Sequence, residues 1–64
     1  MKLSQADLDV LTRLAGEPLT GRPPSELPPG AHLRPLEEAS YIRWADPAWR
    51  ITLAGAAALE EAAR

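Results

Sequence analysis

Nucleophilic, acid–base and metal chemistry each require particular groups at particular spacings, and this sequence offers few of them. It contains no cysteine and a single histidine, His32. A zinc site without cysteine depends on histidines and carboxylates, and one histidine is too few for it. No Ser, Cys or second His stands at a catalytic spacing from His32. We therefore expect no metal and no cofactor, and a helix-start or surface role for this histidine.

The remaining candidates for acid–base catalysis are two pairs of adjacent glutamates, Glu37 with Glu38 and Glu60 with Glu61. Neighbours on a helix point about 100° apart, because a turn takes 3.6 residues. Catalytic carboxylates instead converge on one cleft with divergent pKa values. We predict a non-enzymatic protein without catalytic residues, in which both pairs are solvated helix surface.

Size and charge narrow the function further. The 64 residues carry a formal net charge of −2 and no polybasic run, and a chain of this length is expected to form one domain, residues 1–64, with a small core. Non-specific DNA binding needs several Lys or Arg side chains to displace counterions from phosphates. The chain also lacks a signal-peptide core and any long apolar run. We expect a cytoplasmic protein without membrane contact, located in the host-cell cytoplasm if a phage encodes it.

The elements that would position these side chains begin with a helix over residues 5–15. Ser4 and Asp7 fit a capping box, and Gly16 is expected to end the helix in the left-handed region. Its predicted apolar stripe is Leu8, Leu11, Leu14 and Ala15.

Residues 17–30 follow as a Pro-rich connector. Five prolines leave room for at most one helical turn, at residues 24–27. We predict an extended segment over the core, with Leu19 and Leu27 buried.

A short helix is predicted from about residue 32 or 34 to residue 40, with Leu33 and Leu36 facing the core. Residues 41–45 and 49–52 then alternate as two strands of a hairpin around Asp46-Pro47-Ala48, which suits a type I turn with proline second. The predicted inner face is Ile42, Trp44, Trp49 and Ile51.

The last helix is predicted at residues 53–63, with Thr52 as its N-cap. Gly55 interrupts a run of strong helix formers, which indicates close approach of another backbone. The predicted apolar face is Leu53, Ala56, Ala57 and Leu59.

Two segments resemble the winged helix-turn-helix family. Leu36-Glu37-Glu38-Ala39-Ser40-Tyr41-Ile42 is similar to the segment in which a Leu-Glu pair precedes a Gly-Tyr-Ile start of the wing, with Ser40 in place of glycine. Ile51-Thr52-Leu53-Ala54-Gly55 is similar to its Leu-Thr-x-x-Gly close. The resemblance implies an α+β, winged-helix-like fold and, in a small DNA-binding regulator, phosphate contacts by Arg34, Arg43 and Arg50.

Small, cysteine-free, mildly acidic proteins also include phage anti-CRISPR inhibitors, which this chain resembles in type. That resemblance implies a DNA mimic that occupies the basic nucleic-acid-binding surface of a CRISPR effector. The available carboxylates are Asp7, Asp9, Glu37, Glu38, Asp46, Glu60 and Glu61.

The acidic helix and the nearly absent second helix favour the protein-binding inhibitor, which is our leading prediction and would act by DNA mimicry or by steric block of target DNA binding. Two alternatives remain. The arginines favour a DNA-binding regulator, and the alanine-rich last helix would suit a dimerisation or structural module.

Overall fold

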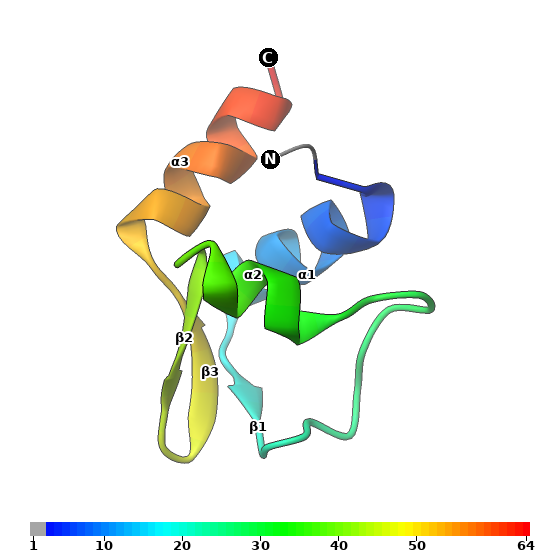
Figure 1. The fold of residues 1–64 in the computed structure, drawn as a ribbon, viewed down its shortest axis with the longest axis vertical. Helices are drawn as coiled ribbons and strands as arrows, with labels where there is room; N and C mark the ends of the chain where they lie inside the picture. Colours follow the sequence, from blue (N-terminus) through cyan, green and yellow to red (C-terminus); the bar gives the residue numbers. More distant parts are fainter. Residues whose placement is uncertain (1–2) are drawn as a thin grey trace.

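The fold combines three helices with a small antiparallel sheet in this computed structural model, which describes residues 3–64 (Figure 1). The elements in chain order are α1 (Gln5–Gly16), β1 (Leu19–Thr20), α2 (Leu33–Glu38), β2 (Ile42–Ala45), β3 (Ala48–Ile51) and α3 (Leu53–Ala62). The strand order in the sheet is β1-β3-β2. The predicted α+β class is confirmed.

The start of α1 agrees with the prediction and its end does not. The Asp7 N–H donates to Ser4 Oγ at 3.2 Å, and the Ser4 N–H donates to the Asp7 carboxylate at 3.0 Å, which completes the capping box. Gly16 belongs to the helix and is not left-handed, so the expected glycine cap is wrong. The extended residue Glu17 instead ends the helix, and its N–H donates to the Arg13 carbonyl at 2.9 Å.

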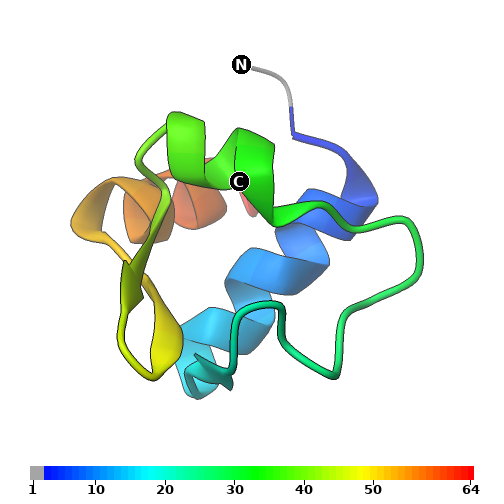
Figure 2. The same cartoon turned by 60° about the horizontal axis from the view of Figure 1, so that its bottom comes forward.

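The Pro-rich connector contains a strand that the sequence pattern did not predict. Leu19 and Thr20 of β1 pair with Trp49 and Ala48 of β3. A strand of two residues is too short for alternation to reveal it. Leu19 is buried as expected, whereas Leu27 is 37% exposed, so its predicted burial is wrong. Figure 2 shows the rest of the connector as a wide loop before α2.

The predicted hairpin forms with a shorter loop. Ala45 pairs with Ala48, so the loop is Asp46 and Pro47, and Pro47 takes the third turn position where we expected the second. The Asp46–Pro47 bond is cis, so the type I turn is wrong.

Cross-strand pairing puts the two tryptophans opposite each other. Trp44 pairs with Trp49, and their rings meet edge to face with centroids 5.5 Å apart. Ile42 and Trp49 are buried and Trp44 is half-buried, as the predicted inner face requires.

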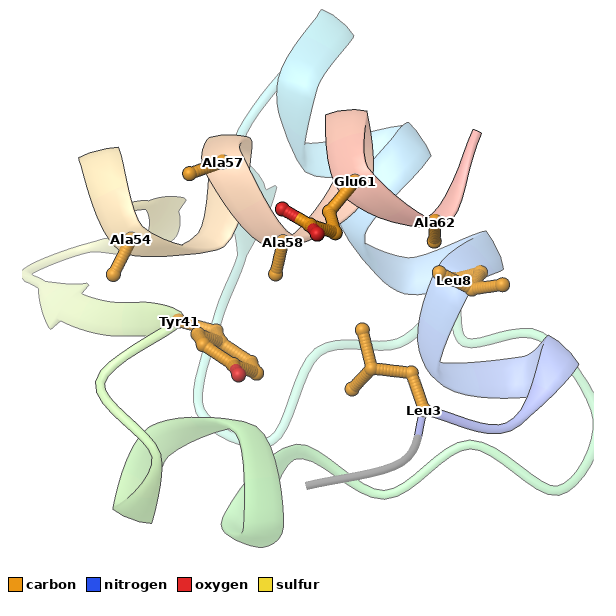
Figure 3. Close-up of a pocket in the computed structure, with 8 residues that line it drawn as sticks. All are labelled: Leu3, Leu8, Tyr41, Ala54, Ala57, Ala58, Glu61 and Ala62. Atoms are coloured by element: carbon orange, nitrogen blue, oxygen red, sulfur yellow. The ribbon is translucent and has the colours of Figure 1, made fainter. Parts of the chain in front are cut away.

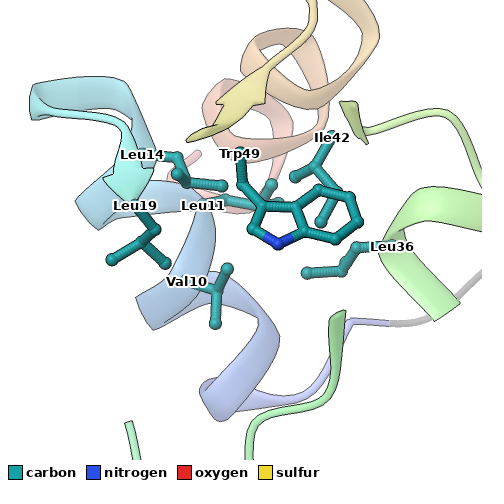
Figure 4. Packing of buried hydrophobic residues seen from close by; sticks show 7 residues of the cluster. All are labelled: Val10, Leu11, Leu14, Leu19, Leu36, Ile42 and Trp49. Carbon is teal, nitrogen blue, oxygen red and sulfur yellow. The ribbon is translucent and has the colours of Figure 1, made fainter. Parts of the chain in front are cut away.

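The core lies where α1, α2 and the inner face of the sheet meet (Figure 4). Trp49 fills its centre and is 3% exposed. Its indole N–H is buried without a hydrogen-bond partner among the described residues. The predicted stripe of α1 is only partly right, because Val10 is fully buried while Leu8 is half-buried and Ala15 is exposed. The core cluster comprises Val10, Leu11, Leu14, Leu19, Leu36, Ile42 and Trp49.

Hydrogen bonds and a close backbone contact hold α3 against the start of the hairpin. The Thr52 N–H donates to the Tyr41 carbonyl at 3.0 Å, and Thr52 Oγ1 accepts from the Gly55 N–H at 3.0 Å. Thr52 Oγ1 also donates to the Ser40 carbonyl at 2.5 Å. A Cβ on Gly55 would lie 2.0 Å from the Tyr41 carbonyl oxygen. The predicted N-cap and the predicted close approach at Gly55 are both confirmed.

The predicted apolar face of α3 is right at Leu59, which packs against the core, and wrong at Leu53, Ala56 and Ala57, which are exposed. Gly55 is its buried residue and Ala58 and Leu59 are half-buried, whereas Leu53 is 91% exposed. Contact through Gly55 sets the rotation of the helix, and a residue two positions earlier points about 200° away. Leu53 therefore faces outward.

Candidate functional site

The short helix α2 is held by one buried side chain and exposes its charged residues. Leu36 is 0% exposed, while Glu37 is half-buried and Arg34 and Glu38 are exposed. His32 is the N-cap and makes no side-chain capping hydrogen bond. A helix this short depends on packing for its stability, so Leu36 determines how α2 presents these charges.

Both glutamates of α2 form ion pairs with arginines of the same chain. Glu38 accepts from Arg34 Nε at 3.0 Å, one turn away on the helix. Glu37 lies 3.5 Å from an Arg22 guanidinium nitrogen. Exposed pairs of this kind contribute at most about 1 kcal/mol to stability. They nevertheless show that these carboxylates have arginine partners before any external partner arrives.

The outer face of the hairpin carries two arginines without an ion-pair partner. Arg43 and Arg50 are directly opposite each other in the β2–β3 ladder, and both are exposed. Neither forms a salt bridge within residues 3–64. Opposite Cβ atoms in such a ladder are roughly 4.5–5.5 Å apart, and like charges there are destabilising. Neither core packing nor ion pairing among the described residues explains why two arginines are opposite each other here.

A fourth arginine, Arg22, was not among the predicted site residues. Its guanidinium carbon lies 4.9 Å from the Trp49 ring centroid and 5.5 Å from that of Trp44. The turn after β1 brings it there, where Gly21 (φ 94°) donates its N–H to the Pro47 carbonyl at 2.8 Å. No sequence signal marks this contact, because it depends on the pairing of β1 with β3.

We group these side chains under the name arginine surface: Arg22, Arg34, Arg43 and Arg50, with Glu37 and Glu38 among them. Arg22 contacts the tryptophans of the inner face, whereas Arg43 and Arg50 are on the outer face of the hairpin. Arg22 and Glu37 line a shallow hollow together with Arg43 and Trp44. They also line a second hollow, with Arg34 and Trp49. Arg22 thus shares one hollow with Arg43 and another with Arg34, whereas Arg50 lines neither and is placed by its pairing with Arg43.

The predicted carboxylates do not share one face. Glu37 and Glu38 lie on α2, and Asp46 lies in the hairpin loop. The start of α1 and the end of α3 lie side by side (Figure 1). The remaining four carboxylates belong to this end of the molecule: Asp7, Asp9, Glu60 and Glu61.

An apolar groove lies beside this second acidic group (Figure 3). It has a volume of about 500 Å³ and runs between Leu3 and Leu8 on one side and the small residues of α3 on the other. Glu61 and Tyr41 are its polar lining residues. Glu61 forms no ion pair in the described part of the chain.

Within residues 3–64, no three or more His, Cys, Asp or Glu side chains are placed to hold a metal ion. No helix in the same range has the length and apolar character needed to cross a membrane. Comparison of the chain with protein-family models, with curated proteins and with solved structures gives no match.

Proposed function

We propose that this protein is a small winged-helix-like module that binds nucleic acid through phosphate contacts of its arginine surface. The order helix, strand, helix, hairpin, helix supports this reading, as does a first strand that pairs with the second strand of the hairpin. In the winged-helix resemblance, α2 takes the place of the recognition helix and the β2–β3 hairpin that of the wing. The loop over residues 21–32 stands where that family has its second helix.

The observation that carries the proposal is the Arg43–Arg50 pair. Two exposed guanidinium groups opposite each other in a ladder cost stability unless an anion lies between or beside them. A nucleic-acid backbone supplies phosphate anions, and arginine binds phosphate with paired N–H donors. The pair therefore has a physical role in a complex that it lacks in the free protein.

The negative net charge of the whole chain argues against nucleic-acid binding, but the charge is unevenly distributed. The whole chain has a net charge of −2, but the arginine surface includes four arginines and two glutamates, and the glutamates pair with Arg22 and Arg34. This leaves an excess of two positive charges there, before Asp46 at the hairpin tip is counted. The balancing acidic residues include the group at the far ends of α1 and α3. A protein with few contacts binds phosphates weakly and with a shallow salt dependence.

The test is fluorescence polarisation with a labelled mixed-sequence duplex at about 50 mM salt, where phosphate contacts are strongest. We expect the double variant Arg43→Ala/Arg50→Ala to bind more weakly than wild type, and its log–log salt slope to fall by roughly two. Arg64→Ala is the matched control, because it removes an exposed arginine paired with Glu60 at the end of α3. No binding by wild type up to about 100 µM, the weak limit of non-specific association, would refute the proposal.

The acidic end of the molecule supports a second candidate, the phage anti-CRISPR inhibitor that the composition suggests. Here the carboxylates around the apolar groove, rather than Glu37 and Glu38, would face a basic protein surface. Asp9 and Glu61 have no arginine partner within the described residues, so both can bind an external cation. Pull-down with a purified CRISPR effector complex tests this candidate. Capture that persists in Asp9→Lys/Glu61→Lys would remove its basis.

A further inference from the structure

Arg22 is held by three groups that come from three different elements. Trp49 belongs to β3 and Trp44 to β2, and their ring centroids lie 4.9 and 5.5 Å from the guanidinium carbon. Glu37 of α2 lies 3.5 Å from one terminal nitrogen. The aromatic contacts place the cation over the indoles, and the carboxylate fixes its direction. Arg22 itself comes from the loop after β1.

These contacts use only part of the hydrogen-bonding capacity of the side chain. A guanidinium carries five N–H donors in a fixed plane, and a single hydrogen bond to protein is formed here, with Glu37. The side chain is 50% exposed, and no other hydrogen bond of its guanidinium is formed within residues 3–64. The platform beneath it is rigid, because Trp49 is 3% exposed and at the centre of the core.

We infer that Arg22 is a phosphate-binding residue of the arginine surface, and that Glu37 is a positioning residue that holds its guanidinium ready for the phosphate. This inference rests on the nucleic-acid-binding function proposed above. Arg22 lines one hollow with Arg43 and another with Arg34, so it stands between Arg43 of the wing and Arg34 of α2. An ordered side chain loses less conformational entropy when it binds.

The inference reverses the expected effect of an acidic residue in a nucleic-acid interface. If Glu37 only repelled phosphates, removal of its charge would strengthen binding. If it positions Arg22, the same change frees the guanidinium and weakens binding. Ordering one long side chain costs enough to account for about a threefold loss of affinity. The direction of the change therefore separates the two roles of the same carboxylate.

The experiment measures affinity for a labelled duplex of about 20 base pairs at two salt concentrations, for wild type, Glu37→Gln, Arg22→Ala and the double variant. We expect Arg22→Ala to bind about tenfold more weakly, with a salt slope lower by about one. Glu37→Gln should bind about threefold more weakly than wild type, and should have no further effect in the Arg22→Ala background. Glu61→Gln, which removes one negative charge beside the distant groove, should leave the affinity equal or slightly higher.

Circular dichroism at 222 nm confirms that each variant is folded at the assay temperature, and Arg22→Lys provides a second variant that keeps the charge but loses the planar group. Tighter binding by Glu37→Gln, or equal loss in the Arg22→Ala background, would overturn the positioning role. Wild-type affinity in both Arg22 variants would overturn the phosphate-binding role of Arg22. It would not affect the proposal that Arg43 and Arg50 contact phosphates. Failure of wild type to bind would refute the proposed function itself, and this inference with it.

Discussion

Gly55→Ala is the sharpest stability test that the structure offers, because the added methyl group would meet backbone rather than a flexible side chain. A Cβ built at this position lies 2.0 Å from the Tyr41 carbonyl oxygen and 2.9 Å from Ile51 Cγ1. Relaxed contacts between heavy atoms lie near 3.5–4.0 Å, so α3 and the residues before β2 would have to separate by roughly 1 Å or more.

Three contributions set the expected magnitude. Overpacking of this kind costs about 1–3 kcal/mol and occasionally more. The separation also lengthens the bond from the Thr52 N–H to the Tyr41 carbonyl, now 3.0 Å, and that loss costs about 0.5–1.5 kcal/mol. Alanine recovers about 1 kcal/mol through its greater helix propensity. The sum is a net destabilisation of about 0.5–3.5 kcal/mol, centred near 2 kcal/mol, out of roughly 3–10 kcal/mol for a domain of this size.

The assay is thermal unfolding followed by circular dichroism at 222 nm. For a domain this small, a loss of about 2 kcal/mol lowers Tm by about 8–16 °C. Gly16→Ala is the matched control, because Gly16 lies in α1 without a positive φ and has no atom within 4 Å of an added Cβ. That variant should match or exceed wild type by up to about 1 kcal/mol. A Tm for Gly55→Ala equal to or above that of wild type would refute the reasoning.

Two further predictions concern Ser40 and the wing. Ser40 has φ 64°, a conformation that glycine adopts without steric cost. Ser40→Gly should therefore raise the free energy of unfolding by about 0.5–1 kcal/mol in a urea titration, whereas Ser40→Ala should not. A lower urea midpoint for the glycine variant would contradict this. Arg50→Glu places a carboxylate opposite Arg43, so it should raise the free energy of unfolding by about 0.2–1 kcal/mol, and Tm with it. The same variant should weaken duplex binding more than Arg50→Ala does. Stability and binding that fall together would show that Arg50 serves the fold.

Elements with a local chemical signal were predictable from the sequence. The capping box at Ser4 and Asp7, the N-cap at Thr52 and the alternation around Trp44 and Trp49 each depend on residues close in sequence, and each is confirmed. Gly55 was informative for a similar reason, because a glycine in a run of alanines has no local purpose.

Features that depend on tertiary contacts were not predictable. β1 exists only through pairing with β3, and nothing in Leu19 and Thr20 alone distinguishes a strand from a connector. The rotation of α3 follows from the Gly55 contact, so a periodicity that included Leu53 pointed to the wrong face.

Prediction of the candidate site divided in the same way. Arg43 and Arg50 follow from strand alternation, which placed both on the outer face of the hairpin. The ion pair between Arg22 and Glu37 joins residues 15 apart in sequence, so it could not be inferred. The acidic helix therefore looked free to bind a basic partner, although Arg22 and Arg34 already face its carboxylates.

The edge-to-face pair of Trp44 and Trp49 provides an intrinsic spectroscopic probe of ligand binding. The chain has two tryptophans, and both belong to this pair, with the Arg22 guanidinium beside the rings. Its tryptophan emission therefore reports on one place in the molecule, where the hairpin meets the core. Exciton coupling between the two indoles would add a near-ultraviolet dichroism signal sensitive to the angle between their rings. A ligand that moved Arg22 or the hairpin could then be detected without any label attached to the protein.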